Sequence, residues 1–299
     1  MEKRSAQPQN VGMNTNITET APVTVNMILD RFARDYLPYE LAPRTQKDYA
    51  RHLVKLREVF GSRIAEELRP RDFGPFLDVK RGKFQRVRQL AVLSSAFSEA
   101  VSTYFMLERN VLRDVKRPRG KPRDRLVSDE EFASFRAMAP KRVQIAMDLA
   151  LLTGQRQGDI LDLKWSQVKD GAILIEQSKT GKRLAIELSP ELKRVLGKCW
   201  LLPNRAEYVL TRRCGGRFTS EGFRSKWQML MQKWVRGGGA RFTFHDLRAL
   251  CATKCPTMEM AMHLLGHSNI SMTRRVYRRG IERVSPLRLG VPNESSSRV

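Results

Sequence analysis

The sequence predicts a mainly α-helical protein of two domains, with a small antiparallel β-sheet in the second domain. Three observations lead to this fold class. Apolar residues recur at helical spacing in four segments of the first third of the chain. A basic segment with two prolines, residues 116–125, then interrupts the pattern. Farther on, two strand-like segments follow the turn-forming pairs Asp170-Gly171 and Thr180-Gly181.

Composition and charge indicate the class of partner. The 299 residues are 41% hydrophobic and 29% charged, which is typical of globular domains with a real core. Lys and Arg number 55 against 31 Asp and Glu, a net charge of +24 that favours nucleic acid or an anionic surface. No apolar run approaches the roughly 20 residues of a membrane span, and the N-terminus lacks the apolar stretch of a secretory signal. We therefore expect no membrane partner and a cytoplasmic, nucleoid-associated location.

The first domain is predicted to be a helical DNA-binding domain over residues 22–115, after a disordered polar tail at residues 1–21. Four segments each carry one apolar face: Val23 to Tyr36 before Pro38, Tyr49 to Phe60 before Gly61, Pro70 to Leu77, and Leu90 to Tyr104. The basic linker, residues 116–126, follows. Candidate DNA-binding residues lie on the helices and in this linker: Arg44, Lys47, Arg86, Arg88, Lys116, Arg117 and Arg119. The alternative for each of them is a solvated surface charge.

The second domain is predicted over residues 127–285, with a tail at residues 286–299. Ser128 and Glu131 form a capping box that opens its first helix, and Gly154 ends the next. The two strand-like segments form a hairpin whose tip reads QSKTGKR. Ser189-Pro190 starts a further helix, and the helix from Ser220 carries aromatic residues that we assign to the core.

One stretch, Thr243 to Tyr277, brings phosphate-binding groups together. Thr243 and Asp246 form a capping-box pattern, so we expect a helix from Phe244 that presents His245 and Arg248 on one face near its N-terminus. Gly266 is expected to end the following helix and to leave His267 at a corner. A last helix is expected to open at Ser271 or Thr273, to carry Tyr277 and to end at Gly280. A guanidinium, two imidazoles and a phenol can then surround one phosphate.

Two cysteines and two histidines near the C-terminus are spaced too closely for a zinc site. Cys251, Cys255, His263 and His267 resemble a ligand set, but only residues 256–262 separate the two pairs, whereas a zinc finger has about 12 residues there. Pro256 and Thr257 also start a helix inside the gap. We predict no metal site and treat the two cysteines as small buried residues.

Five sequence elements, taken together, resemble the tyrosine recombinases of the phage integrase family. They are TGQRQGDILDLKW, QSKTGK, HDLR, LLGH, and a tyrosine ten residues after His267. The resemblance covers residues 127–280, and the helical domain and linker are similar to the family's core-binding domain and connector. It implies a C-shaped clamp around duplex DNA, formed by the core-binding domain and an α+β catalytic domain.

The resemblance also implies a role for each site residue. Arg156 and Arg248 grip the scissile phosphate, and Asp159 orients Arg156. Tyr277 attacks the phosphate to form a 3′-phosphotyrosine, with His245 as the proton acceptor. Lys179 protonates the departing 5′-oxygen, and His267 binds the phosphate or positions Tyr277. The reaction conserves the bond energy, so we expect no ATP, cofactor or metal.

By the same resemblance, the active species is a homotetramer on two short core sites, passing through a Holliday junction, with accessory DNA-bending proteins as further partners. A bacterial, phage or mobile-element origin is implied. One departure is the segment after Arg248, ALCATKCPTMEMAM, which lacks the family's HTFA-type continuation. We expect the tail before residue 22 to be too short for an arm-type DNA-binding domain. Residues 286–299 are expected either to dock on a neighbouring subunit or to be disordered.

Two alternatives remain open at this point. A type IB topoisomerase uses the same chemistry to relax supercoils without pairing two sites. A non-catalytic architectural or regulatory protein on the same fold would bind DNA without any need for the tyrosine.

Overall fold

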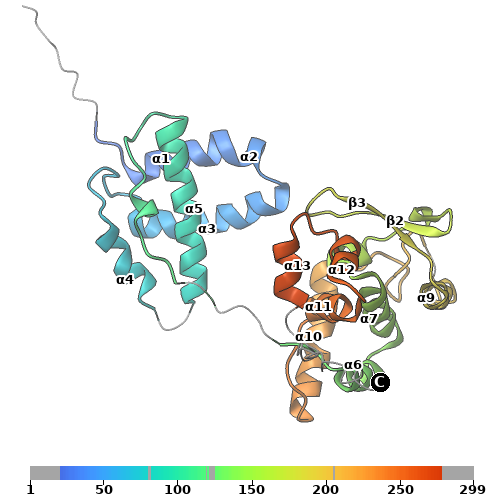
Figure 1. Ribbon diagram of the computed structural model, residues 1–299. Helices are drawn as coiled ribbons and strands as arrows, with labels where there is room; N and C mark the ends of the chain where they lie inside the picture. The colour runs from blue at the N-terminus through green and yellow to red at the C-terminus, as the bar shows by residue number, and fades with distance from the viewer. Residues whose placement is uncertain (1–20, 80–81, 119, 121–124, 205, 278–299) are drawn as a thin grey trace, which may run out of the picture. The chain divides into compact units, whose positions relative to one another are not determined.

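The computed structural model describes residues 21–79, 82–118, 120, 125–204 and 206–277. The chain divides into two compact units, Met1–Pro122 and Arg123–Val299, whose boundary falls inside the basic segment 116–125 (Figure 1). The two tails expected from the sequence, apart from Ala21, lie outside the described residues, as does Arg119. Each unit has its own hydrophobic core.

Apart from an isolated β-bridge between Thr24 and Ile64, the regular secondary structure among the described residues of the first unit is helical. Its main helices are α1 (Val25–Arg31), α3 (Pro43–Phe60) and α5 (Lys83–Ser102). The prediction that the first helix ends before Pro38 is wrong. A π-helical turn (Phe32–Tyr36) continues into α2 (Leu37–Glu40), where Pro38 occupies the second position. A proline is tolerated there because the first N–H groups of a helix have no partner within it.

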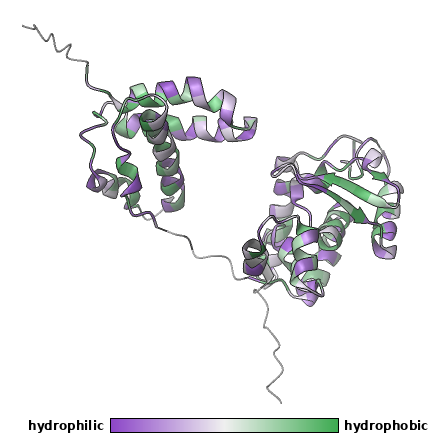
Figure 2. Cartoon of the chain, turned by 45° about the horizontal axis from the view of Figure 1, so that its top comes forward, coloured by the Kyte–Doolittle hydropathy of each residue, from purple (hydrophilic) through white to green (hydrophobic). Residues whose placement is uncertain are grey.

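Aromatic side chains fill the core of the first unit. Phe60, at the end of α3, lies 5.2 Å from both Phe73 and Phe76, measured between ring centroids. The segment predicted as one short helix from Pro70 is two successive turns, a 3-10 turn (Pro70–Phe73) and α4 (Gly74–Leu77). A second 3-10 turn (Val111–Arg113) follows α5. Hydrophobic and hydrophilic residues alternate along the helices of both units (Figure 2).

The second unit opens as the sequence predicts. The capping box of Ser128 and Glu131 starts α6 (Asp129–Met138), and α7 (Lys141–Thr153) ends at Gly154. Gly154 has a φ of +63°, and a Cβ there would lie 2.7 Å from a methyl group of Leu265, so only glycine fits. The short helix α8 (Gln157–Leu161) begins three residues after Gly154.

A three-stranded antiparallel sheet follows α8 and a 3-10 turn (Trp165–Gln167). The predicted hairpin is confirmed as β2 (Ala172–Glu176) and β3 (Arg183–Glu187), and a two-residue strand, β1 (Val168–Lys169), adds to its edge. After it come α9 (Pro190–Trp200) and α10 (Ser220–Arg236). The aromatic residues of α10 belong to the core as predicted, since Phe223 and Trp227 are buried and pack against Phe244.

The last three described helices are α11 (Asp246–Lys254), α12 (Met258–Leu265) and α13 (Ile270–Tyr277). Two predicted starts are wrong. The carboxylate of Asp246 accepts hydrogen bonds from the main-chain N–H and the hydroxyl of Thr243, which is one half of the capping box that the sequence predicts. The N–H groups of residues 246–248, however, donate to carbonyls three residues back rather than four, so α11 begins two residues later than expected. The last helix begins at Ile270, where the Asn269 side chain accepts from the N–H of Ser271. Gly280 lies outside the described residues.

None of the helices in the described parts of the chain has the length and apolar character needed to cross a bilayer.

Candidate active site

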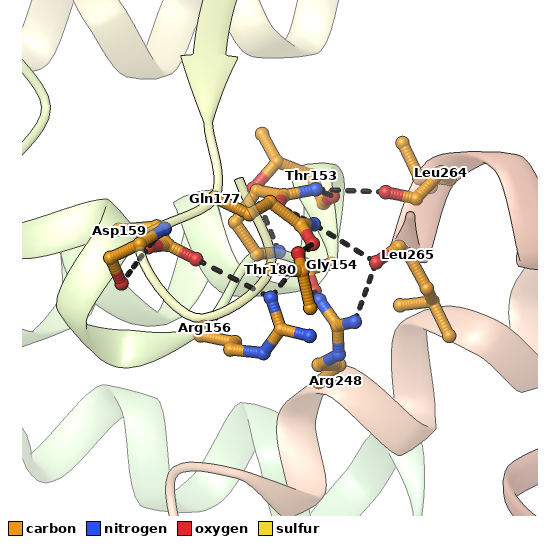
Figure 3. A network of polar contacts seen from close by, with 11 residues as sticks. Thr153, Gly154, Arg156, Asp159, Gln177, Thr180, Arg248, Leu264 and Leu265 are labelled. Atoms are coloured by element: carbon orange, nitrogen blue, oxygen red, sulfur yellow. Dashed lines mark hydrogen bonds and ion pairs between the residues drawn. The ribbon is translucent and has the colours of Figure 1, made fainter. Parts of the chain in front are cut away.

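Three segments that are far apart in the sequence meet at one end of the second unit. They are the turn from α7 to α8, the β2–β3 turn, and the end of α12 beside the start of α11 (Figure 3). Polar contacts join the three segments, and most of the candidate catalytic residues lie on or beside them.

Arg248 is a buried cation held by main-chain oxygens. Its side chain reaches from α11 to donate one hydrogen bond to the carbonyl of Gly154 and one to that of Leu265, both at 2.6 Å. Burial, together with the charge of Arg156, lowers the pKa of Arg248 to about 10, so the guanidinium remains charged at neutral pH. Its two hydrogen-bond partners are neutral carbonyls rather than carboxylates. The positive charge is therefore available to a bound anion.

Arg156 lies at the start of α8 and is oriented mainly by an amide. Its Nη1 donates to Oε1 of Gln177 at 2.7 Å, whereas the nearest oxygen of Asp159 is 3.9 Å away. The other Asp159 oxygen accepts from both the N–H and the hydroxyl of Ser178, at 3.0 and 2.7 Å. The Asp159 carboxylate thus holds the β2–β3 turn more directly than it holds Arg156.

Two buried glutamines complete the network and were missed by sequence reasoning. The Gln177 side chain is fully buried; its Nε2 donates to Oε1 of Gln155 and to the carbonyl of Leu265. Gln155 in turn donates to the carbonyl of Leu264. The only sequence feature that could have indicated them is their position, because each glutamine lies within two residues of a predicted catalytic cation.

Lys179 lies exposed in the β2–β3 turn. No hydrogen bond or ion pair joins its ammonium to another described residue. The anchors of this turn are instead the two neighbours of the lysine, Ser178 and Thr180.

His267 lies at the corner that the sequence predicts, directly after Gly266, whose φ is +65°. Its Nδ1 is 2.9 Å from the hydroxyl of Thr273 on α13. Burial, and then the charges of Arg248 and Arg156, lower the pKa of His267 to about 4. The imidazole is therefore neutral at physiological pH.

His245 is the residue that precedes α11 and is exposed. The prediction that His245 lies inside the helix is wrong, because α11 begins one residue after it.

Tyr277 is the last residue of α13. Its backbone follows Thr273 by four residues, one helical turn from the contact with His267. The side chain of Tyr277 lies outside the described part of the structure.

The candidate DNA-binding residues of the first unit differ in their surroundings. Arg44, Lys47, Arg88 and Lys116 are exposed. Arg86 stacks over the ring of Phe76 at 4.4 Å. Arg117 is half buried and donates to the carbonyl of Leu112, and burial lowers its pKa. Arg119 lies outside the described residues.

The described residues include no group of three or more His, Cys, Asp or Glu side chains that could hold a metal ion. Cys251 is buried, as predicted, while Cys255 is only partly buried at the end of α11.

Comparison with known proteins decides the family. The sequence pattern of the Phage integrase family matches residues 128–282, more than half of the 299-residue chain. The chain belongs to this family. It is 29% identical over 281 residues to the integrase of Escherichia phage lambda, an alignment that covers 87% of this chain and 77% of that protein.

Two solved structures of lambda integrase resemble this chain over most of its length. One is a dimer bound to a COC′ core site and the other a tetramer bound to a Holliday junction. Each gives a TM-score of 0.76 at 26% identity and covers 89% of this chain and 81% of that chain. The integrases of Escherichia phage lambda and Enterobacteria phage 434, each 29% identical to this chain over 281 residues, are phage proteins, which indicates a phage or mobile-element origin.

The family therefore establishes the class of enzyme. The chain is a tyrosine-type site-specific recombinase, and neither a type IB topoisomerase nor a non-catalytic DNA-binding protein is favoured.

Proposed function

We propose that the protein cuts and rejoins duplex DNA at short core-type sites through a covalent 3′-phosphotyrosine, with Arg156, Lys179, His245, Arg248, His267 and Tyr277 as its catalytic residues. The observation that carries the proposal is the pair of arginines oriented by amide and carbonyl oxygens, so that their charge is kept for an anion. Attack on a phosphodiester places extra negative charge on its non-bridging oxygens. Two fixed guanidiniums stabilise that charge by several kcal/mol each, to order of magnitude.

Tyr277 is the proposed nucleophile. A phenol has a reference pKa of about 10 and attacks slowly at neutral pH unless a base accepts its proton. His245, exposed at the start of α11, is the proposed acceptor. Attack at phosphorus forms the phosphotyrosine bond and breaks the bond to the 5′-oxygen of the next nucleotide. The reverse reaction, with a 5′-hydroxyl from another strand, restores the DNA backbone without ATP.

Lys179 is the proposed donor of a proton to the departing 5′-oxygen. Its exposed position in the β2–β3 turn allows its ammonium to reach a bound DNA strand. His267 is proposed to bind the scissile phosphate as a neutral imidazole. When its Nδ1 accepts from the Thr273 hydroxyl, the proton is on Nε2, which then donates to a phosphate oxygen.

The helical unit and the linker are proposed to complete a clamp around DNA. Arg44, Lys47, Arg88 and Lys116 are exposed cations suited to phosphate contacts. Solved structures show lambda integrase as a dimer on a core site and as a tetramer on a Holliday junction. We propose the same assemblies for this protein, with accessory DNA-bending proteins as further partners. We also propose a nucleoid-associated, cytoplasmic location. Residues 286–299 are proposed to dock on a neighbouring subunit.

The test is covalent capture. The protein is incubated with nicked suicide substrates that carry its candidate core site, and the DNA–protein adduct is resolved on a denaturing gel. We expect an adduct that Tyr277→Phe abolishes. No adduct on any cognate site would overturn the proposal, and relaxation of supercoils without exchange between two sites would instead indicate a topoisomerase.

A further inference from the structure

One buried side chain joins the separate parts of the active site. The Gln177 amide makes four hydrogen bonds, the full capacity of a glutamine side chain. Its Oε1 accepts from Arg156 at 2.7 Å and from the Thr180 hydroxyl at 3.1 Å. Its Nε2 donates to Oε1 of Gln155 at 2.8 Å and to the Leu265 carbonyl at 3.0 Å. The partners fix the orientation of the amide, because a guanidinium only donates and a carbonyl only accepts.

The main chain of Gln177 closes the β2–β3 turn. Its carbonyl accepts from the N–H groups of Thr180 and Gly181, and its own N–H donates to the carbonyl of Lys182. The residue therefore belongs to the turn through its backbone and to the arginine cluster through its side chain. A displacement of this amide would move the turn relative to both arginines.

Lys179 depends on this arrangement for its position. Its ammonium forms no hydrogen bond or ion pair with another described residue, so the lysine is placed by its neighbours in the turn. Ser178, before it, is held by Asp159, and Thr180, after it, is held by Gln177. Of Asp159 and Gln177, only Gln177 also contacts the main chain at the end of α12, where Arg248 is bound.

The chemistry of the site requires an amide at position 177. A carboxylate would keep the acceptor for Arg156 and lose both donors, and an apolar side chain would lose all four hydrogen bonds. The space is also fixed, since a Cβ on Gly266 would lie 2.7 Å from Nε2 of Gln177.

We propose that Gln177 is a positioning residue for catalysis: its buried amide fixes the β2–β3 turn to Arg156 and to the end of α12, and so sets the reach of Lys179 toward the leaving oxygen. The proposal rests on the proposed function, in which Lys179 protonates that oxygen. It adds a residue that touches neither DNA nor the reacting atoms.

The test compares two leaving groups in single-turnover cleavage of a suicide substrate. One substrate has the normal 5′-oxygen at the scissile phosphate, and the other has sulfur there. A thiol has a pKa of about 8.5 and leaves as a thiolate without a proton, so the sulfur substrate does not need a placed acid. Three references frame the result: wild type must cleave both substrates, Lys179→Ala must be slow only on oxygen, and Arg156→Ala must be slow on both.

Gln177→Met removes the amide at similar volume. We expect a loss of at least about tenfold on the oxygen substrate and a clearly smaller loss on the sulfur substrate, with DNA affinity unchanged. Equal losses on both substrates would overturn the proposal, because Gln177 would then act through Arg156 or through packing alone.

Thr180→Val tests the same link at an exposed residue where folding is not at risk. It removes the hydroxyl that binds Gln177 and keeps the side-chain shape. We expect a loss of about fivefold on oxygen and none on sulfur, while Thr180→Ser, which keeps the hydroxyl, stays near the wild-type rate. A wild-type rate for Thr180→Val on the oxygen substrate would count against the proposal even if Gln177→Met does not fold.

The reference variants separate this proposal from the proposed function. If Lys179→Ala is equally slow on both substrates, then Lys179 is not the acid that protonates the leaving oxygen, and the proposed function is wrong on this point. If Lys179→Ala behaves as expected and the two network variants do not, only the role of Gln177 fails.

Discussion

The guanidinium of Arg248 donates a 2.6 Å hydrogen bond to the main-chain carbonyl of Leu265, two residues before His267. One side chain therefore binds the segment that carries a second candidate catalytic group. The same guanidinium reaches the carbonyl of Gly154, two residues before Arg156. The relative positions of three candidate catalytic residues thus depend on one buried arginine.

Replacing Arg248 by lysine tests the need for a forked cation. Lysine keeps the charge but cannot hold two carbonyls and a phosphate with one planar group. We expect cleavage to fall by about 10²–10³-fold, the range found when one preorganised donor to a transition state is removed. DNA affinity should change by less than about threefold, since many other cations bind the backbone. Single-turnover cleavage and a binding assay measure the two effects, and a rate near wild type would exclude the forked role.

Asp159→Asn and Asp159→Ala distinguish two roles for the carboxylate. If Asp159 mainly holds Ser178 through Oδ1, asparagine can keep that acceptor and should cleave within a few fold of wild type. Alanine removes the acceptor and should cost about tenfold in cleavage. The amide hydrogen of Ser178 should also exchange faster in the alanine variant. Equal defects in both variants would instead indicate that the negative charge acts on Arg156.

His267 makes stability depend on pH in a defined window. Its pKa in the folded protein is about 4, below the reference value of about 6.5, so the unfolded chain takes up the proton first as the pH falls. The stabilisation is complete above pH 6.5 and is lost between pH 6.5 and 4. We expect the neutral imidazole to contribute up to about 3 kcal/mol, of which about 2 kcal/mol is lost between pH 7 and pH 5.

Tryptophan fluorescence can measure this effect, because all four tryptophans lie in the second unit. The pH dependence of the free energy of unfolding in wild type is compared with that of His267→Gln, so that titrations common to both proteins cancel. An identical pH dependence would contradict the assigned pKa.

Gly266→Ala should destabilise the second unit through two effects. The residue has a φ of +65°, which an alanine adopts only at a cost, and its Cβ would overlap with the Gln177 amide. Gly171→Ala is the matched control, since Gly171 has a φ of +72° with nothing within 4 Å of the added carbon. We expect about 1 kcal/mol for the control and at least 1–2 kcal/mol more for Gly266→Ala in the free energy of unfolding. Equal losses in the free energy of unfolding for the two variants would mean that the backbone at residue 266 moves to make room for the added carbon.

The salt dependence of DNA binding tests the cations of the first unit. Arg44→Ala with Lys47→Ala should lower the slope of log affinity against log salt by about 2 if both bind phosphates. Arg86→Ala should also lower the stability of the first unit, because Arg86 stacks on Phe76. An unchanged slope for the double variant would place Arg44 and Lys47 away from DNA.

Local sequence signals predicted most of the fold. Gly154 and Gly266 end helices as expected, and the capping box of Ser128 starts α6. Errors occurred at the starts of helices. Asp246 makes the predicted contact with Thr243, but the next main-chain hydrogen bonds span three residues, so α11 begins two residues late. This choice depends on the geometry of the turn and is not visible in residue spacing.

The sequence motifs indicated the charged groups, the imidazoles and the phenol of the candidate site, but not its buried amides. Arg156, Lys179 and Arg248 follow from motif order, because phosphate chemistry requires cations. Gln177 did not, because its importance arises from three segments that meet only in the folded chain. A buried amide has no charge or spacing signature in sequence, and its partners are mostly main-chain or neutral groups.

The two carbonyls that bind Arg248 belong to helix ends. Leu265 is the last residue of α12, and Gly154 caps α7, so both oxygens are among the acceptors that a helix leaves unpaired at its C-terminus. Arg248 is therefore a shared cap of two helices as well as a candidate catalytic group, and it also meets the negative ends of both helix dipoles. A lineage that no longer needed recombination could not discard this arginine without weakening the domain. In such a lineage, inactivating substitutions should accordingly appear first at exposed groups such as Lys179 and last at Arg248.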